Sequence, residues 1–367
     1  TWTRGFVWGA SMVVRKEAWD NLVSKGFRSI LTDRKGNTLS AGGDTEICYA
    51  LRNEGWKIWY NPGLKFRHYI SSGRLNWKYL RKLFRGFGNA SAGLDEYRKK
   101  IPERLLKESG VKKPSSVRYE LHKALKVLRK TRYKKLLSFK RRREGDTDIP
   151  MLEYTSGRIE SLLKTKGSYN RGIKLLKKTA RKNDFKYLSS VLGNGYSDFP
   201  RYRKVKKLNG VSVIICTYNG ADRLTETIRH IAKQKVNPDI LWEVILVDNA
   251  STDNSKEVTQ NEWNRHKCKA KLKIIDQPIP GKQLALEKGY EVAKYEYWLT
   301  CDDDNWLEEN FVQLTYEIMS SNEKIGVLGG PNEALCELDP PEWFKWFQKD
   351  YAAGPQGDIY TGKVSEG

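Results

Sequence analysis

Four short apolar runs, each followed by polar residues, occupy the C-terminal half of the chain. The first, VSVIICT at 211–217, leads into ADRLTETIRHIAKQ, whose apolar residues recur at helical spacing. The same order of run, turn and helix returns at 242–255 and 271–294, and a last run ends in acidic residues at 295–306. Continuous apolar strands that alternate with helices are typical of a parallel sheet. We therefore expect a Rossmann-like α/β sheet, with ligands beyond the carboxyl ends of its strands.

The first 85 residues also mix strands and helices. The pattern at 3–19 predicts a short strand and then a helix, and residues 57–70 predict two strands around Asn-Pro-Gly. Between them, residues 42–56 predict a helix with Ile47 and Leu51 on its inner face. This region therefore has the same α/β character as the C-terminal half.

A basic segment separates these two regions. The chain has a net charge of +23, yet residues 97–210 alone carry 34 Lys and Arg against 10 Asp and Glu. The segment has no Trp and no Cys, and its Val117, Leu121, Leu125 and Leu128 share one helical face. We therefore expect three parts: a first α/β part at 1–96, a basic, mainly helical extension at 97–208, and a second α/β part at 209–367.

The five Cys residues show no CxxC spacing, and no apolar run approaches the roughly 20 residues that cross a bilayer. The opening residues do not have the pattern of a signal peptide. These features predict a reducing, cytoplasmic location.

The most informative polar cluster is CDDDNW, which places Asp302, Asp303 and Asp304 at the end of an apolar strand. Three adjacent carboxylates repel one another unless water or a cation offsets their charge. Carboxylate oxygens suit Mg²⁺ or Mn²⁺ carried in with phosphates. The pattern predicts that Asp302 and Asp304 face the same side and that Asp304 is exposed to solvent. A solvated acidic turn without a ligand is the alternative, which the three preceding strands disfavour.

A second cluster, VDNASTDNS, follows the strand at 242–248. Ser251 or Asp253 is expected to cap the next helix. Capping explains Asp248 less well, because an acid that emerges from the sheet is suited to hydrogen bonding a base or a ribose. We therefore favour a binding role for Asp248.

Together, CTYNG, VDNASTDNS, PGKQLALEKGY and LTCDDDNW resemble, in order and spacing, the nucleotide-binding half of GT-A-type inverting glycosyltransferases of family two. The resemblance implies a GT-A fold, a nucleotide-sugar donor and Mn²⁺ or Mg²⁺. It implies that the acids of LTCDDDNW hold the metal and the diphosphate. It further implies nucleotide contacts from Thr217, Tyr218, Asn219, Asp248, Lys282, Asp302 and Asp303. The chain departs from the family pattern at Leu286 and Glu287, where Arg-Asn is common.

Residues 1–85 resemble the second half of the same family, which normally follows the first. On that basis we expect a circularly permuted order. The resemblance implies acceptor contacts around RGFVWGAS and AGGDTE, from Gly9, Ala10, Gly43, Thr45 and Glu46. Gly43 stands where the family usually has an acid.

Two residues of this N-terminal part have competing interpretations. From the residues alone, helix capping by Asp44 or Thr45 is favoured, whereas the resemblance makes Asp44 the catalytic base. His68 by itself is more often a structural histidine, whereas the resemblance adds it to Asp302 and Asp304 as a metal ligand.

The sequence thus predicts an inverting, metal-dependent hexosyltransferase of cell-surface polysaccharide biosynthesis, with a glycan or lipid-linked acceptor. The basic helices suit an anionic membrane surface, which would make the protein peripheral on the inner membrane face. A solvated basic subdomain that packs on the catalytic part is an equally good interpretation. The alternative function is a basic nucleic-acid- or membrane-binding protein on an inactive nucleotide-binding scaffold. The basic segment lacks the interleaved aromatics of single-strand binders, which disfavours nucleic acid. A nucleotidyltransferase is disfavoured because no Gly-rich, Lys/Arg-bearing loop follows the first strand.

Overall fold

A seven-stranded mixed sheet forms the centre of the protein in a computed structural model that describes residues 5–31, 39, 41–102, 113–137, 144–179 and 208–356. The strand order is β2-β9-β1-β7-β4-β5-β6. Four of these strands, β7, β4, β5 and β6, run parallel to one another. Their bounds are β4 Val211–Thr217, β5 Trp242–Asp248, β6 Lys271–Asp276 and β7 Tyr297–Asp302. The prediction of an α/β sheet with these four strands is confirmed.

Both faces of the parallel strands are covered, which explains their continuous apolar sequences. In β4, Val213 and Ile215 join one apolar cluster, whereas Ile214 joins the cluster on the opposite face. Helix α10 approaches so closely that a Cβ at Gly289 would lie 2.4 Å from Ile214. The helices that follow these strands are α8 Ala221–Ala232, α9 Ser255–His266, α10 Lys282–Val292 and α11 Phe311–Ser321.

Strands from the N-terminal region complete this sheet. β1 (Val13–Arg15) lies between β7 and β9 (Ile325–Gly329) and is antiparallel to both, while β2 (Lys57–Tyr60) pairs with β9 in parallel. The buried Arg15 side chain donates hydrogen bonds to the backbone oxygens of Met319, Asn322 and Ile325. The two ends of the described chain therefore share one core. Helices α1 (Lys16–Ser24) and α2 (Gly43–Asn53) lie between the strands in sequence.

A three-stranded sheet lies beside the large one, with the order β10-β3-β8. It combines β3 from the N-terminal region with β8, which follows β7 after a two-residue turn. Short helices pack near it in an apolar cluster that also includes Leu80 and Leu83 of a longer helix. The bounds are β3 Phe66–Ile70, β8 Asn305–Leu307, β10 Asn332–Cys336, η1 Ser72–Arg74, α12 Phe344–Phe347 and η3 Gln348–Tyr351.

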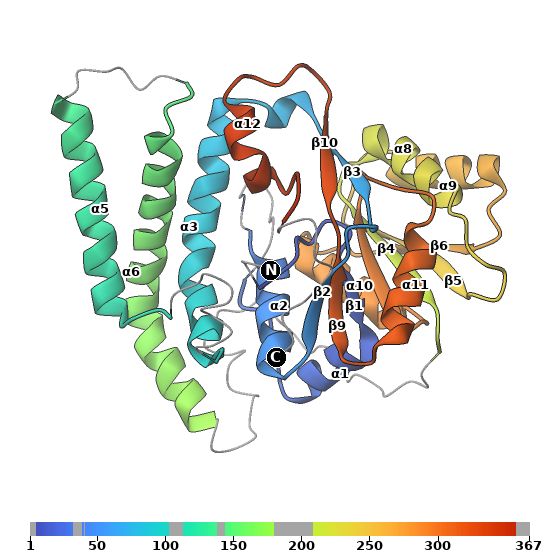
Figure 1. The fold of residues 1–367 in the computed structure, drawn as a ribbon, viewed down its shortest axis with the longest axis horizontal. Coiled ribbons are helices and arrows are strands. Elements are labelled where there is room, and N and C mark those ends of the chain that lie inside the picture. Colours follow the sequence, from blue (N-terminus) through green and yellow to red (C-terminus); the bar gives the residue numbers. More distant parts are fainter. Residues whose placement is uncertain are drawn as a thin grey trace.

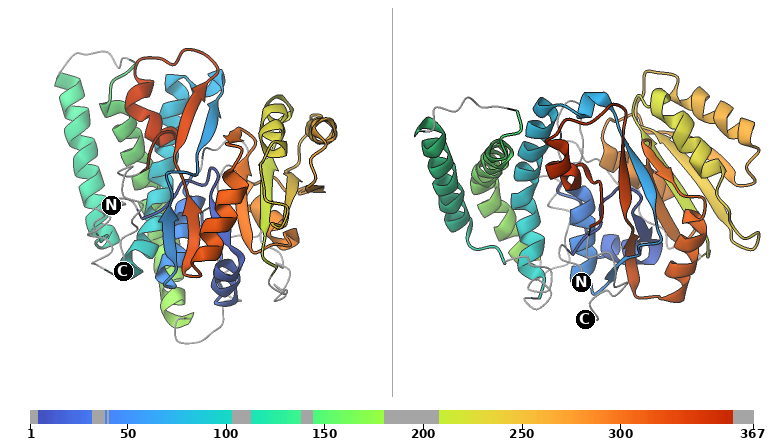
Figure 2. Two further views of the ribbon diagram at one scale, coloured as in Figure 1. Left: turned by 45° about the vertical axis from the view of Figure 1, so that its right-hand side comes forward. Right: turned by 45° about the horizontal axis from the view of Figure 1, so that its top comes forward.

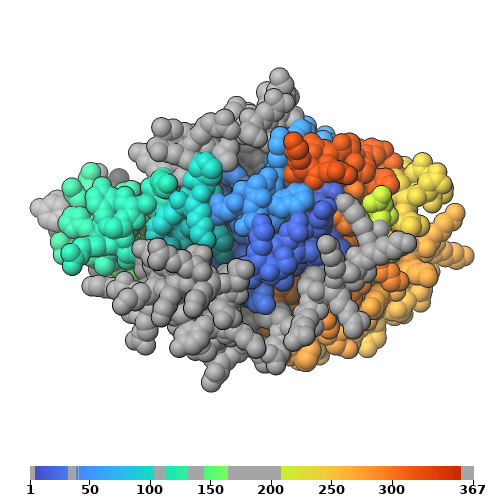
Figure 3. Space-filling model, turned by 90° about the horizontal axis from the view of Figure 1, so that it is seen from below, coloured from blue at the N-terminus to red at the C-terminus, as the bar shows by residue number. Residues whose placement is uncertain are grey.

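Three long helices form a layer on one side of this α/β body: α3 (Trp77–Lys100), α5 (Val117–Leu137) and α6 (Asp148–Thr179). In Figure 1 the order from the left is α5, α6, α3, then α2 and the sheet. The views of Figure 2 keep α5 at the edge of the layer. From below, residues of the N-terminal region lie between these helices and the C-terminal strands and helices (Figure 3).

Helices α3 and α6 cross with their backbones in contact. A Cβ at Gly88 would lie 2.0 Å from the Tyr154 carbonyl oxygen, and one at Gly157 would lie 2.2 Å from that of Arg85. Arg158 then connects the three helices, because it hydrogen bonds Ser91 and Asp95 of α3 and Glu120 of α5. Within the described ranges, no helix is long and apolar enough to cross a membrane.

The extension expected at 97–208 is only partly described, because 103–112, 138–143 and 180–207 lie outside the described residues. Its predicted helical face at 117–128 is confirmed, since the four residues are partly buried around a buried Ala124. Helix α3, however, begins at Trp77 and runs across the expected boundary at 96/97. The first helix of the layer is therefore continuous with the part that carries His68.

Candidate active site

The carboxyl ends of the central strands meet at one edge of the sheet. Thr217 is paired with Asp248 on the neighbouring strand, and Cys216 is paired with Asp302 on the other side. Between this edge, the start of α2 and helix α3 lies a cavity of about 870 Å³. Thr217 and Asp302 line it, together with Asp44. Ligand pockets usually measure about 300–1,000 Å³, so the cavity can hold a large ligand.

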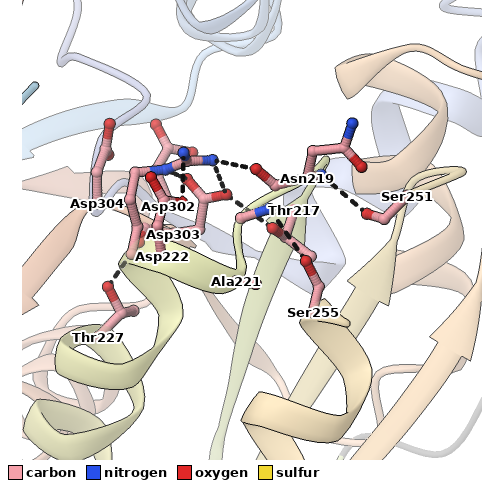
Figure 4. Close-up of polar contacts among 12 residues, drawn as sticks. Thr217, Asn219, Ala221, Asp222, Thr227, Ser251, Ser255, Asp302, Asp303 and Asp304 are labelled. Atoms are coloured by element: carbon pink, nitrogen blue, oxygen red, sulfur yellow. Dashed lines mark hydrogen bonds and ion pairs between the residues drawn. The ribbon is translucent and has the colours of Figure 1, made fainter. Parts of the chain in front are cut away.

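Asp303 ties together the start of α8 and the end of β7 (Figure 4). Its Oδ2 accepts a hydrogen bond of 2.7 Å from the Thr217 hydroxyl and an ion-pair contact of 3.0 Å from Arg223. A Cβ at Gly220 would lie 2.4 Å from the same oxygen, so only glycine leaves room for it. Burial raises the pKa of Asp303, against the lowering effect of Arg223. In this structure the Asp303 carboxylate therefore positions the β4–α8 loop.

The β4–α8 and β5–α9 loops are joined by polar contacts (Figure 4). Asn219, in a left-handed conformation with φ of 47°, donates from its backbone N–H to the Ser251 hydroxyl at 3.0 Å. Asp248 accepts a 3.0 Å hydrogen bond from the backbone N–H of Ser251. Asp253 accepts from the backbone N–H groups of Ala221 and Ser255. The expectation that Ser251 or Asp253 is the cap residue of α9 is wrong, because the cap position belongs to Asn254. The Ser251 hydroxyl holds Asn219 instead, while Asp253 accepts from the N–H of Ser255, the first residue of the helix.

Asp302 and Asp304 leave the strand toward different cations. Lys282, at the first turn of α10, forms an ion pair of 2.7 Å with Asp302. Arg74 donates a 2.8 Å hydrogen bond to Oδ2 of Asp304. Asp304 is 8% exposed, so the expectation of a solvent-exposed carboxylate is wrong. The chain turns directly into β8, which pairs with β3 and encloses Asp304.

His68 and Asp304 converge on the Arg74 guanidinium. Nε2 of His68 lies 3.6 Å from Oδ2 of Asp304 and 3.3 Å from the Arg74 nitrogen that bonds this oxygen. An imidazole nitrogen and a carboxylate oxygen are both ligands for Mn²⁺. In this structure both of them face the positively charged guanidinium of Arg74. Among the described residues, no three His, Cys, Asp or Glu side chains gather as a metal site. Of the expected metal ligands Asp302, Asp304 and His68, the structure therefore brings together only Asp304 and His68.

Asp44 lies in the first turn of α2, beside the N-terminal strand region. Its Oδ2 accepts a 2.7 Å hydrogen bond from the Gly9 backbone, and its Oδ1 accepts one of 2.6 Å from Thr45. The helix is capped by Gly42, with φ of 109° and no side-chain cap. Burial raises the pKa of Asp44, against the lowering effects of both backbone N–H groups and Lys282. A raised pKa brings a carboxylate closer to the range in which it can accept a proton at neutral pH.

The cavity includes most, but not all, of the residues expected at the site. Cavity-lining residues among them are Asp44, Gly9, Ala10, Thr45, His68, Thr217, Tyr218, Lys282, Asp302, Asp303 and Asp304. Asn219, Asp248, Gly43 and Glu46 are not among the lining residues. Glu46 is fully buried, and its carboxylate accepts hydrogen bonds from Ile30, Leu31 and Tyr97, so the expected acceptor contact is wrong in this structure.

Two arginines of the site were not anticipated. Arg74 follows β3 at the end of η1, and Arg223 lies in the first turn of α8. Arg223 did leave a signal, because a cation at a helix N-terminus is unfavourable unless an acid pairs with it. Arg74 left none, since its contact with Asp304 joins residues far apart in the sequence.

Glu287 of α10, which departs from the family pattern, lies close to the cavity-lining Gln283. The two side chains share a 3.0 Å hydrogen bond, while Oε2 of Glu287 is buried with no hydrogen-bond partner in the described part of the chain. Burial raises the pKa of Glu287 to about 7, with Glu46 adding to the rise and Gln283 and Arg28 opposing it. The folded protein therefore retains a proton that the unfolded chain releases.

This pKa predicts a stability that falls with pH. Unfolded Glu titrates near 4.5 and folded Glu287 near 7, so the free energy of unfolding decreases between these values, by about 3 kcal/mol in all. We expect Glu287→Gln to melt above the wild type at pH 8 and together with it near pH 4.5, as measured by circular dichroism. Glu291→Gln, on the exposed side of the same helix, should change little at either pH. Parallel melting curves for the wild type and Glu287→Gln across this range would contradict the assignment.

Sequence comparison connects one part of the chain to a known family. The model described as "Glycosyl transferase family 2" matches residues 212–360, which include the four parallel strands and Asp302–Asp304. Two curated relatives are 31% identical. "Glycosyltransferase GlyG" of Streptococcus pneumoniae aligns over 120 residues, 32% of this chain and 38% of its own. "Cholesterol galactosyltransferase" of Borreliella burgdorferi aligns over 106 residues, 29% of this chain and 28% of its own.

Solved structures show similarity over a comparable stretch. Staphylococcus aureus TarS 1–349 in complex with UDP-GlcNAc is 27% identical, with a TM-score of 0.26, over 31% of this chain and 32% of that one. The mannosyltransferase PcManGT from Pyrobaculum calidifontis, in complex with GDP-Man and Mn²⁺, is 28% identical, with a TM-score of 0.24, over 28% of this chain and 31% of that one. The chain thus spans about a third of the length of these relatives. Residues 212–360 thus match the family 2 glycosyltransferase model, the family that the sequence motifs resemble.

Proposed function

We propose that this protein is an inverting glycosyltransferase that moves a hexose from a nucleotide-diphosphate donor to an acceptor hydroxyl in cell-surface polysaccharide biosynthesis. One observation carries the proposal. Asp44, from the N-terminal region, lines the same cavity as Lys282 and Asp302 of the family 2 segment. The proposed base and the proposed diphosphate-binding edge thus face one cavity.

The donor lies at the sheet edge in this proposal. Thr217, Tyr218 and Asp248 stand at or just beyond the strand ends, where nucleotides bind in sheets of this type. Asn219 holds the two loops together, and its side-chain oxygen accepts a 2.8 Å hydrogen bond from Thr252. Tyr218 is 53% exposed and free to stack on a base. Lys282 and Asp302 meet the diphosphate, and Asp303 holds the loop that carries Thr217. The named ligands of two relatives, UDP-GlcNAc and GDP-Man, are donors of this class.

Mn²⁺ or Mg²⁺ is assigned to Asp304 and His68, with Asp302 turned toward the diphosphate side. The convergence of these two side chains on one cation supports the assignment. A bound divalent cation would offset charge on the leaving diphosphate. Arg74 would have to release Asp304 for a metal to bind there, so metal and guanidinium compete for one carboxylate oxygen.

The chemistry assigned to the protein's own residues is a single displacement. Asp44 accepts the proton of the acceptor hydroxyl. At the same time the hydroxyl oxygen bonds to the anomeric carbon of the donor, and the bond between that carbon and the diphosphate breaks. The hydrogen bonds from Gly9 and Thr45 fix the carboxylate for this step. Lys282 stabilises the departing diphosphate. One displacement inverts the anomeric configuration, so no second, nucleophilic carboxylate is required.

The chain order is proposed to be a circular permutation of the family pattern, with domains at 1–96 and 209–367 that form one GT-A unit around the extension. The pairing of β1 with β7 and of β2 with β9 supports one unit made from both regions. A circular permutation would also bring the two termini close together, but Thr1 and Gly367 lie outside the described residues. The protein would act on the inner membrane face, with its basic extension against anionic lipid.

A donor screen tests the proposed function. UDP-, GDP- and dTDP-sugars are incubated with the protein and Mn²⁺, and release of nucleoside diphosphate is measured beside binding to RNA and DNA. We expect slow hydrolysis of one donor class, lost with EDTA, and weak nucleic-acid binding that salt abolishes. Tight, salt-resistant binding to nucleic acid with no hydrolysis of any donor would favour an inactive scaffold instead.

A further inference from the structure

The cavity has two ends of opposite character. At the sheet edge its walls carry the acids Asp302–Asp304 with their cations, and Tyr79 of helix α3 lies beside one of these cations, Arg74. Further along α3 the walls carry Phe84 and Phe87. Phe6, Tyr49 and Tyr154 add further rings to this second part of the cavity, and we call Phe84, Phe87 and these three residues the aromatic chamber. A ligand that fills the whole cavity therefore needs one charged end and one apolar end.

Asp44 lies at the junction between the two ends. The turn before it packs directly on α3, since a Cβ at Gly42 would lie 3.3 Å from Ala90 and 3.7 Å from Leu94. The positive charge of Lys282 acts on the Asp44 carboxylate and lowers the pKa of Asp44. A hydroxyl that reaches Asp44 from the α3 side therefore passes along an apolar wall, while the donor approaches from the Lys282 side.

Two polar side chains of α3 that line the cavity, Ser91 and Arg98, already make contacts within the protein. Ser91 donates to the Gly88 carbonyl and accepts from Arg158, and Arg98 pairs with Asp95. An oligosaccharide acceptor would need many hydrogen-bonding groups in place of the water it gives up. The rings and the neighbouring Leu83, Leu94 and Met151 instead favour an acceptor that buries hydrocarbon.

We infer that the acceptor is an amphipathic lipid, which places its hydroxyl at Asp44 and its hydrocarbon body in the aromatic chamber. The inference rests on the proposed function, because the donor must take the other end. Charge supports a membrane as the source: residues 97–210 carry 34 basic against 10 acidic residues, and polybasic segments are attracted to anionic bilayers. Met151 is 52% exposed on α6 and lines the cavity, so it stands where the chamber opens to solvent.

The test uses methyl, butyl, hexyl and octyl glucoside, each below its micellar concentration. Each glucoside that enters the chamber changes the rate of donor hydrolysis, either by accepting the sugar or by blocking water. We expect the half-saturating concentration to fall by about three- to fourfold for each added methylene that is buried. Equal values for methyl and octyl glucoside would overturn the inference.

Two matched variants locate the effect. Met151→Glu places a charge at the chamber, whereas Leu163→Glu places one at an equally exposed position of the same helix that does not line the cavity. We expect Met151→Glu to weaken the binding of octyl glucoside about tenfold or more, and Leu163→Glu to bind octyl glucoside as the wild type does. Identical responses of the two variants would overturn the location.

A binding measurement separates this inference from the proposed function. Thermal shift with methyl and octyl glucoside alone requires no donor and no turnover. Chain-length-dependent binding without hydrolysis of any nucleotide sugar would reject glycosyl transfer and keep the apolar site. Donor hydrolysis that no glucoside affects would keep glycosyl transfer and reject a lipid acceptor.

Discussion

Replacing Asp44 by Asn lowers the turnover number by about 10²–10⁴-fold, the usual contribution of a general base, and leaves binding of the nucleotide sugar intact. The donor contacts come from other elements, so the donor KM should change little. Asn can keep one of the two hydrogen bonds that Asp44 accepts from Gly9 and Thr45. The lost bond costs about 1 kcal/mol of stability. Single-turnover kinetics at saturating donor, with melting curves beside them, measure both effects.

Asp253→Asn is the matched control, because Asp253 also accepts two backbone hydrogen bonds but does not line the cavity. It should lose a similar amount of stability and keep its turnover number at saturating donor. The acidic limb of the wild-type pH–rate profile should lie above the ordinary Asp pKa, since burial raises the pKa of Asp44, and should vanish in Asp44→Asn. If Asp44→Asn only melts earlier, with full turnover in its folded fraction, Asp44 serves the helix and another group is the base.

Replacing Asp304 by Asn removes the dependence of nucleoside diphosphate binding on Mn²⁺. Asn is preferred to Ala because Ala would leave the Arg74 guanidinium buried without its acid, at a cost of about 3–5 kcal/mol. The amide oxygen of Asn can still accept from Arg74 but is a weaker ligand than a carboxylate. We expect metal affinity to fall by about 10–100-fold or more, and turnover to fall with it. A loss of this size is usual even for residues that only hydrogen bond a metal ligand. Calorimetric titration of UDP or GDP with and without Mn²⁺ measures the loss.

Asp222→Asn controls for charge alone. Its carboxylate is 73% exposed beside Arg223 and does not line the cavity, so the variant removes the same charge from the neighbourhood without removing a ligand. The Mn²⁺ dependence of diphosphate binding should persist in this variant. Wild-type Mn²⁺ dependence in Asp304→Asn would mean that the metal, if one is used, binds elsewhere.

The strands and their polar ends were predictable because their signals are local. The run at 211–217 became β4 over the same residues, since a strand buried on both faces is mostly apolar along its whole length. The acids at 302–304 follow directly from the end of such a strand. Asp44 and Thr217 could be placed near one another only through the family resemblance, because they lie on separate elements at distant points of the chain.

The remainder of the site depends on long-range packing. Asp304 turned out to be enclosed because β8 folds back on β3, and no local pattern encodes that pairing. Arg74 reaches the site through the same pairing. The domain boundary was expected at 96/97 because the charge of the sequence changes there. Helix α3 nevertheless runs across this boundary to Lys100, and its earlier turns form the chamber wall. A change in composition shows where the charge of the chain changes, which need not be where a structural unit ends.

The position of β1 in the sheet also governs when the protein can finish folding. Val13 is synthesised long before its partners in the sheet, Leu299 and Leu328. Until those residues emerge, the apolar residues of β1, α1 and α2 have no sheet to cover, and closing so long a loop is slow. During synthesis at about 5–20 residues per second, this early segment therefore waits many seconds with apolar surface exposed. A chain with this order forms a cavity from segments far apart in sequence, and until the late strands emerge its early segment is exposed to aggregation.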